Sequence, residues 1–314
     1  MKNVNRLTYG AILLAIFAII LLITLYIPVI GIIMNLFLPL PFIMFAGKND
    51  IKSSLVFFIA SIFISLIVGT LFAIPLTLAY GMTGLIMGIL IREGKSRFNV
   101  FIIGTLVFLL NLVGSYIFSI VFFEVNIIKD SIDLLRESLQ SSQKLLSSLG
   151  QDTSDTMMKQ FENAFSMLET LVPSIFVISS IVMVFIIELV NTPIAKRFGI
   201  KIKNWDPFRN IFLPRSIIWY YLLLLLLSIF LKPETGSFLY SALINIGFIL
   251  QFLLLIQGLS FIYYFSYIKN FSKAVPVIVT ITLFFIPIVL YIVRILGIID
   301  LGFDLRKRLG KKDS

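Results

Sequence analysis

The chain has 314 residues, of which 59% are hydrophobic and 13% are charged, and its mean hydropathy is +1.04. These fractions lie well outside those of a soluble globular domain and indicate a membrane protein. The chain contains no cysteine and no histidine, which excludes disulfides, imidazole or thiolate metal sites and serine–histidine catalytic pairs. We therefore expect no enzyme activity, no cofactor and no metal site. We also expect no nucleic-acid partner, because the residues behind the net charge of +10 lie in short loops between apolar runs.

The apolar runs predict an all-α protein, a polytopic bundle of about nine transmembrane helices, or of eight, at about 20 residues per crossing. No small-residue cleavage site follows the first run, which we expect to remain as the first helix. The second run contains Pro39 and Pro41 and should be short, kinked or partly unwound. In chain order, the predicted spans are about Leu7 to Ile27, Val29 to Ala46, Lys52 to Phe72, Ala73 to Ile91, Phe98 to Phe123, Val172 to Ala195, Ser216 to Leu231, one within Phe238 to Tyr267, and Ala274 to Ile298.

Hydropathy falls between Glu124 and Thr170, where apolar residues recur at helical spacing among charged ones. This insert predicts two amphipathic helices joined near Gly150 and Asp152. They pack on each other, lie along the bilayer or cap the bundle, and the sequence leaves this open. We expect a six-helix transmembrane core at 1–196 with the insert at 124–170, additional transmembrane helices at 197–298, and a basic tail at 299–314.

Basic residues alternate between loops and predict the orientation in the plasma membrane. A cytoplasmic N-terminus places the six basic residues from Lys196 to Arg215 inside and the insert outside the cell. A ninth complete crossing then puts the basic tail outside, against the same rule. Either the tail is an exception, or the last segment, broken by Pro276 and Pro287, enters the membrane and returns. We favour nine crossings, because the last segment has the length of one helix.

Two ionisable side chains, Glu188 and Arg294, lie inside predicted spans, where an unpaired charge costs several kcal/mol. They can pair only if the C-terminus is cytoplasmic. Glu188 is a candidate for proton coupling, and an ion pair with the basic loop after Lys196 is an equal alternative. The uncharged polar residues inside spans are expected to form interhelical hydrogen bonds, and they are Asn35, Asn111, Asn191, Asn245, Gln251 and Gln257.

Several polar residues fall in the outer halves of the fourth and fifth predicted spans or at their ends. Asn111, Ser115 and Tyr116 lie about one helical turn apart and share a face. With Tyr80 and Glu124 they are candidates to line one outward-opening cavity.

Two resemblances extend these predictions. Ala11-x-x-x-Ala15 in the first helix, the proline-bearing second helix, the glycine-rich helices and the basic loop from Arg92 to Arg97 resemble the substrate-binding S components of energy-coupling-factor transporters, over about residues 1 to 196. The whole chain, including the ending from Gly297 to Arg308, resembles the YybS-like family of bacterial membrane proteins, which is distantly related to S components.

The likeness to S components implies a transport role. It implies that Ala11 and Ala15 dock on a transmembrane coupling subunit, which cytoplasmic ATPases drive. It also implies that Tyr26 borders the ligand together with the polar residues of the fourth and fifth spans, and that the ligand is a small organic solute such as a vitamin.

A non-transport role is the alternative. In that case the protein is an interaction or scaffold protein of the cell envelope, and Met157, Phe161 and Phe165 in the insert form a stripe that binds a partner.

Overall fold

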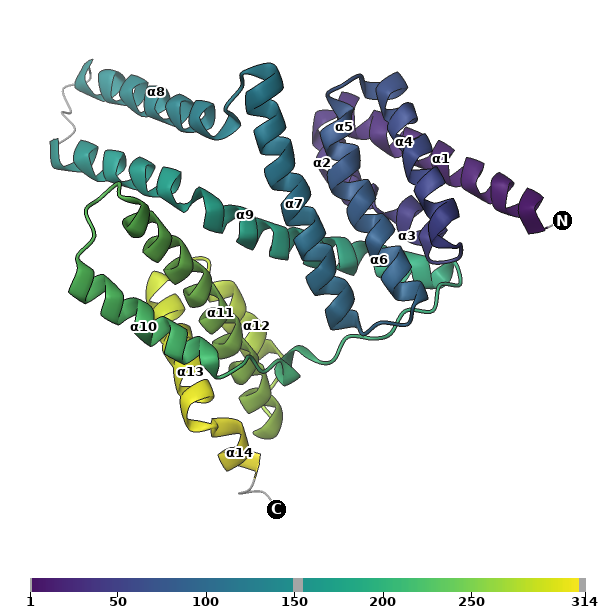
Figure 1. The fold of residues 1–314 in the computed structure, drawn as a ribbon. Coiled ribbons are helices and arrows are strands. Elements are labelled where there is room, and N and C mark those ends of the chain that lie inside the picture. The colour runs from purple at the N-terminus through teal and green to yellow at the C-terminus, as the bar shows by residue number, and fades with distance from the viewer. Residues whose placement is uncertain (1, 149–154, 311–314) are drawn as a thin grey trace. The chain divides into compact units, whose positions relative to one another are not determined.

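The computed structural model describes residues 2–148 and 155–310, and every regular element in these ranges is a helix (Figure 1). This confirms the predicted all-α fold. The expected junction of the insert helices near Gly150 and Asp152, and the tail residues Lys311 and Lys312, lie outside the described residues.

Within the described ranges, seven helices or broken helices are long and apolar enough to cross a membrane, and an eighth crossing arises if the bent pair near the C-terminus counts as one span. Both counts lie below the nine predicted helices, and eight crossings require either this bent pair or a shorter helix. A further apolar helix, α10 (Ser216–Leu231), has only 16 residues. The seven spans are α1 (Lys2–Tyr26), the broken span α2 (Pro28–Met34), η1 (Asn35–Phe37) and α3 (Leu40–Ala46), α4 (Ile51–Gly69), the broken span α5 (Ala73–Leu76), η2 (Thr77–Met82) and α6 (Thr83–Arg92), α7 (Arg97–Phe123), α9 (Asp155–Arg197) and α11 (Phe238–Ile268).

The helices form two compact units. Unit 1 comprises residues 1–152 and 179–205, and unit 2 comprises residues 153–178 and 206–314. Helix α9 contributes its first part to unit 2 and its second part to unit 1. The predicted boundary of the six-helix core, at residue 196, lies instead at the end of the same helix.

The second span of unit 1 is broken as predicted. Pro28 begins α2, and Pro39 and Pro41 flank the start of α3. A proline has no backbone N–H and cannot continue the hydrogen-bond ladder of a preceding helix. Six residues of α3 are buried, and its aromatic rings form the core of the unit. Phe42 contacts the rings of Phe17 and Phe57 edge to face, at centroid distances of 5.1 and 5.4 Å.

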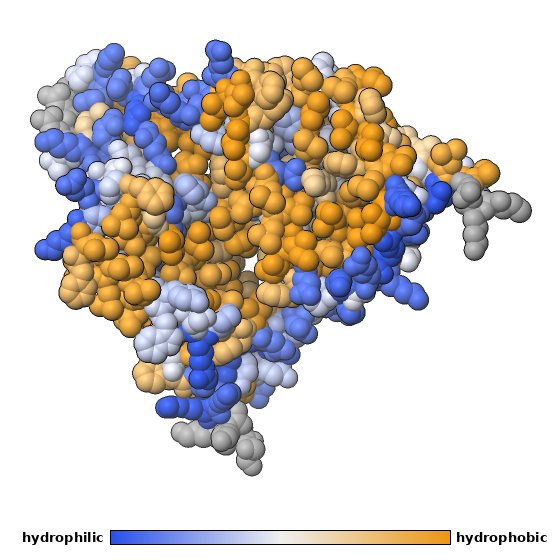
Figure 2. All heavy atoms as spheres, in the orientation of Figure 1, coloured by the Kyte–Doolittle hydropathy of each residue, from blue (hydrophilic) through white to orange (hydrophobic). Residues whose placement is uncertain are grey.

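The described part of the insert contains one separate amphipathic helix, α8 (Ile127–Ser148). Its second predicted helix and the sixth predicted span are one continuous helix, α9, so the expectation that a separate span begins at about Val172 is wrong. Figure 2 shows hydrophilic side chains over α8 and hydrophobic side chains over α7.

Asn245 of α11 explains how α9 accommodates a proline in its interior. Its Oδ1 accepts a hydrogen bond from the backbone N–H of Ser174 at 2.9 Å, and its Nδ2 donates to the carbonyl oxygen of Thr170 at 2.7 Å. The side chain thus binds two backbone groups that face each other across one turn of α9, beside Pro173. This confirms the interhelical hydrogen bond predicted for Asn245.

In unit 2, α11 packs closely against α13 (Pro287–Phe303). A Cβ atom added to Gly258 would overlap the carbonyl oxygen of Val293, and one added to Gly297 would overlap that of Leu254. The two helices run parallel, because successive contacts advance along both chains: Gln251 with Arg294, Gln257 with Asp300, and Tyr264 with Arg306.

The last apolar segment is two helices, α12 (Ala274–Thr282) and α13, which are bent by 119° at a break before Pro287. The expectation that this segment is one helix is wrong. Because α13 runs parallel to α11, both helices end at the same end of unit 2. There Arg306, which follows α13 in α14 (Leu305–Gly310), donates to the carbonyl oxygen of Arg209 in the basic loop at 2.8 Å. These contacts favour a segment that returns over a ninth complete crossing.

Candidate functional site

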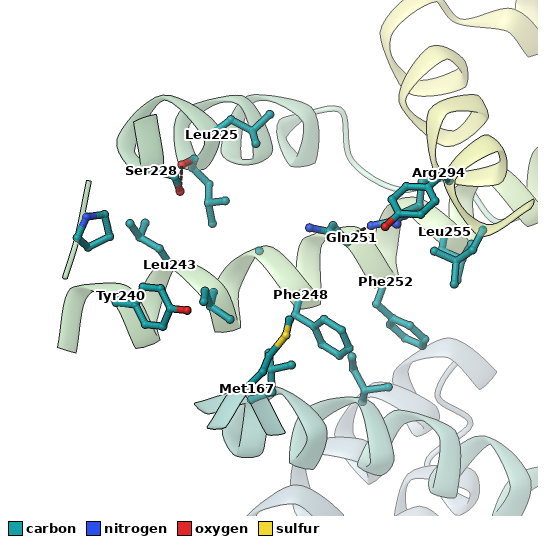
Figure 3. Close-up of a pocket in the computed structure, with 18 of the residues that line it drawn as sticks. Met167, Leu225, Ser228, Tyr240, Leu243, Phe248, Gln251, Phe252, Leu255 and Arg294 are labelled. Carbon is teal, nitrogen blue, oxygen red and sulfur yellow. Dashed lines mark hydrogen bonds between the residues drawn. The ribbon is translucent and has the colours of Figure 1, made fainter. Parts of the chain in front are cut away.

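Unit 2 encloses a cavity of about 850 Å³ (Figure 3). Its walls come from the first part of α9, from α10, from α11 and from α13. A volume of this size lies in the range of small-molecule sites. Most of the wall is apolar, and it includes Met167, Leu171, Leu225, Leu243, Phe248, Phe252 and Leu255.

Polar groups lie toward the two ends of this cavity. Ser228, Lys232 and Tyr240 lie where α10 ends and α11 begins. Gln251 and Arg294 lie farther along, on α11 and α13, and Figure 3 shows their side chains beside each other. From Tyr240 to Gln251 the rise along a helix is about 16 Å. The cavity therefore has an apolar middle between two polar ends, which are called here the mouth, at Lys232, and the inner end, at Arg294.

Local sequence positions each wall of the cavity. Asn245 holds the first part of α9 against α11 through the hydrogen bonds described above. Gly258 and Gly297 allow the backbones of α11 and α13 to meet. Gly236, at φ +86°, lies in the turn between α10 and α11, and Ser237 caps α11 by accepting from the N–H of Tyr240. The cavity walls therefore rest on rigid helix contacts.

Arg294 is the charged group at the inner end. One guanidinium nitrogen, Nη1, donates to Gln251 Oε1, and Cζ lies 4.6 Å from the centroid of the Tyr291 ring. Its Nε atom is buried and has no hydrogen-bond partner among the described residues. No carboxylate in the described part of the chain forms an ion pair with Arg294. An arginine near the centre of a bilayer costs about 3 kcal/mol when its charge is not compensated.

A buried carboxylate of unit 2, Asp300, forms an ion pair with Arg306 rather than with Arg294. Asp300 is fully buried, and its Oδ2 accepts hydrogen bonds from Arg306 Nε at 2.9 Å and from Gln257 Nε2 at 2.6 Å. Arg306 also donates to the Ser260 hydroxyl at 3.1 Å. This network joins α11, α13 and α14 outside the cavity. The partners of Arg294 that the structure describes, Gln251 and Tyr291, are neutral.

Comparison with known proteins identifies the family. The model of the family described as "Predicted membrane protein (DUF2232)" matches residues 15–301, a range that contains the whole cavity. The chain belongs to this family. It is also 34% identical over 310 residues to the "Uncharacterized protein YybS" of Bacillus subtilis (strain 168), and the match covers 98% of this chain and 100% of the relative. No solved structure matches. The predicted YybS-like membership is confirmed, whereas the likeness to S components stays a prediction.

Glu188 of this family member pairs with a residue that the sequence analysis did not consider. Arg97 Nε lies 2.5 Å from Glu188 Oε2, and their side chains are 6% and 1% exposed. Arg97 also donates to the Thr192 hydroxyl at 2.5 Å. The expected partners, Arg294 and the basic residues after Lys196, are therefore wrong. That loop contributes Trp205, whose ring centroid lies 5.6 Å from Arg97 Cζ. A role of Glu188 in proton coupling stays a prediction.

The side chains predicted to border a ligand are engaged in separate contacts. The Tyr26 hydroxyl donates to the carbonyl oxygen of Val68 at 3.0 Å. Tyr80 lies in the π-helical element η2 and accepts from Asn35 Nδ2 at 3.0 Å. Asn111 Nδ2 donates to the carbonyl oxygen of Val107 at 2.7 Å.

The rest of that predicted set lies toward the end of α7. Tyr116 donates to Asn126 Oδ1 at 3.1 Å, Ser115 is half-buried, and Glu124 ends α7 at φ 54°. The cavity of unit 2 and the two smaller cavities of unit 1 described below are lined by none of the six predicted residues. Their role in binding stays a prediction.

The predicted docking face on α1 is exposed. Ala11 and Ala15 are both exposed. Ala11 lines a groove of about 600 Å³ between α1 and α4, together with Gly10 and Ala60. In the insert, Phe165 of the predicted partner-binding stripe is buried, whereas Met157 and Phe161 are 49% and 38% exposed.

Gln251 and Arg294 were predicted as polar residues inside spans, but no contact between them was predicted. Ser228, Lys232 and Tyr240 were not predicted, because they lie at helix ends, where polar residues are common. The sequence feature that could have indicated a contact between Gln251 and Arg294 is the pair Gly258 and Gly297, because these glycines allow α11 and α13 to approach closely.

Proposed function

We propose that this protein binds a small organic anion inside the membrane, in the cavity of unit 2, as the substrate-binding part of a transport system. The observation that carries this proposal is the uncompensated charge of Arg294 at the inner end of an apolar cavity. An anionic ligand would supply the missing counter-charge. The planar guanidinium also suits carboxylate and phosphate oxygens, because it offers several donors in one plane.

The cavity wall supports a ligand with a hydrophobic body. Leucine and phenylalanine side chains surround the space between Tyr240 and Gln251. Apolar surface transferred from water to such a wall contributes about 25 cal/mol per Å². The charged group would contact Arg294 and Gln251, and the body would lie along α11. Lys232 at the mouth adds a second cation, which favours entry of an anion.

The lining chemistry supports binding rather than catalysis. Among the described residues that line the cavity, none is an aspartate, glutamate, histidine or cysteine. General acid–base catalysis at neutral pH usually needs one of these side chains. The Ser228 hydroxyl donates to the carbonyl oxygen of Leu224 at 2.9 Å, so it is not activated by a base. Binding followed by release is the simplest use of such a site.

Coupling to an energy source requires a partner in this proposal. The chain carries no glycine-rich phosphate loop that would bind a nucleotide. The exposed Ala11 and Ala15, beside the groove between α1 and α4, are the proposed contact for a transmembrane coupling subunit. Small side chains permit the close helix contact that such docking needs.

The first experiment identifies the ligand. The full chain is purified from native membranes in mild detergent, and its bound small molecules are read by native mass spectrometry. The test variant is Arg294→Gln, and the control is Lys307→Gln, which removes one positive charge from an exposed position in the same unit. We expect an anionic molecule of vitamin size in the parent and in the control but not in Arg294→Gln. An identical set of bound molecules in all three proteins would refute the proposed site.

The second experiment separates binding from transport. Cells that produce the parent protein should accumulate the identified molecule faster than cells that produce Arg294→Gln. A coupling subunit with ATPases should copurify with the parent and be lost when Ala11 and Ala15 are both changed to leucine. Ligand binding without uptake or copurification would retain the binding site and contradict the transport role. A partner that is lost instead when Met157 and Phe161 become serine would favour the scaffold alternative.

A further inference from the structure

Unit 1 contains a second, basic cavity of about 320 Å³ between the turn that joins α6 to α7 and the loop after α9. Three loop residues, Lys95, Lys201 and Lys203, and Arg97 line it. Its apolar floor consists of Ile91, Val100 and Ile202. The cavity lies where α6 ends and α7 begins, which is the depth of lipid headgroups for two spans of this length.

The cavity has more positively charged side chains than carboxylates to pair with them. Arg97 is paired with Glu188, and Lys95 Nζ lies 4.0 Å from Glu93. Lys201 forms no hydrogen bond or ion pair with any residue described in the structure. Within the described ranges, Lys203 donates only to the carbonyl oxygen of Gly94, which carries no charge. Two positive charges therefore face the cavity without a counter-ion from this part of the chain.

The cavity also contains hydrogen-bond donors for an anion. Arg97 uses Nε and Nη2 for Glu188 and Thr192, and its Nη1 has no hydrogen-bond partner in the described part of the chain. The cavity lies at the N-terminus of α7, a helix of 27 residues, where the partial positive charge of the helix favours anions.

We propose that this basic cavity binds a phosphate group, carried either by an anionic phospholipid or by a soluble phosphate compound. A phosphate has more than one negative oxygen and can accept from Lys201, Lys203 and Arg97 at once. Basic pockets between transmembrane helices at a membrane surface commonly hold lipid headgroups. This site is separate from the proposed solute cavity, because all of its residues belong to unit 1.

The test uses the full chain in nanodiscs. One arm contains phosphatidylcholine with a minor fraction of phosphatidylglycerol, and retained phosphatidylglycerol is counted by native mass spectrometry. The other arm contains phosphatidylcholine only, and inorganic phosphate is titrated while Trp205 fluorescence is recorded in a Trp219→Phe background. Lys201→Gln is the first variant, because Lys201 has no hydrogen-bond or ion-pair partner among residues 2–148 and 155–310. Lys201→Gln with Lys203→Gln is the second, and Lys269→Gln with Lys273→Gln is the charge-matched control.

We expect binding to weaken about fivefold in the single variant and by more than tenfold in the double variant, with the control unchanged, because each basic residue near a membrane contributes about 1 kcal/mol. A loss in the phosphatidylglycerol arm alone assigns the site to a lipid headgroup. A loss in the inorganic phosphate arm assigns it to a soluble phosphate. Equal affinity of the double variant and the control in both arms, or no phosphate binding in either arm, would overturn the proposal.

Discussion

Glu188→Gln tests whether the buried ion pair of unit 1 compensates a charge inside the membrane. The substitution keeps the shape of the side chain and removes its negative charge, so the Arg97 guanidinium stays buried without a counter-ion. Removal of one partner from a buried pair costs about 3–5 kcal/mol. Arg97 keeps its hydrogen bond to Thr192, which places the expected loss near the lower value, about 3 kcal/mol. For a unit of this size that corresponds to a fall of about 6–12 °C in the unfolding midpoint.

A double variant separates charge compensation from packing. Arg97→Met with Glu188→Leu removes both charges and fills a similar volume. Replacement of a buried pair by apolar side chains is often neutral or stabilising. We therefore expect the double variant to recover most of the midpoint that Glu188→Gln loses.

The assay is thermal unfolding of the purified protein in detergent, followed by tryptophan fluorescence. The chain contains two tryptophans. Trp219→Phe, at a side chain that is 68% exposed, leaves Trp205 as the reporter beside Arg97. An unchanged midpoint in Glu188→Gln would refute the argument. So would a double variant as unstable as the single one, since loss of packing rather than an uncompensated charge would then explain the effect.

Three further predictions concern packing, topology and pH. Gly297→Ala should separate α11 from α13 and lower the unfolding midpoint, with a cost of about 1–3 kcal/mol. The control is Gly302→Ala on the same helix, which should leave the midpoint nearly unchanged because the nearest contact of the added Cβ is at 3.6 Å. A reporter fused to the C-terminus and one inserted into the loop at 206–215 should be accessible from the same side of the membrane. Accessibility from opposite sides would contradict a returning last segment. Hydrogen bonds from Ser53 hold the pKa of Asp50, the N-cap of α4, below its ordinary value of 3.8. The cap should therefore stabilise α4 fully at a pH above 3.8 and lose this effect as the pH falls through the lowered pKa. Hydrogen exchange in the first turn of α4 should then be faster in Asp50→Ala than in the parent protein at pH 7, and equal in the two proteins in acid.

The sequence by itself determined the class of the protein and most helix positions. Apolar runs of about 20 residues must form helices in a bilayer, because no water is present there to bind free backbone groups. For the same reason the break at Pro39 and Pro41 was predictable, since a proline removes a donor from the helix ladder. The predicted span Ser216 to Leu231 coincides with α10.

Only the tertiary structure decided which buried polar groups meet. Glu188 and Arg97 are 91 residues apart, and Gln251 and Arg294 are 43 apart, so their spacing along the chain carries no signal of contact. The continuity of α9 through Pro173 likewise depends on a side chain from another helix, Asn245. Each pairing follows from the register in which helices pack, and that register is set by the combined fit of many side chains rather than by any local motif. The candidate cavity exists for the same reason, because its walls come from four helices whose positions no single segment encodes.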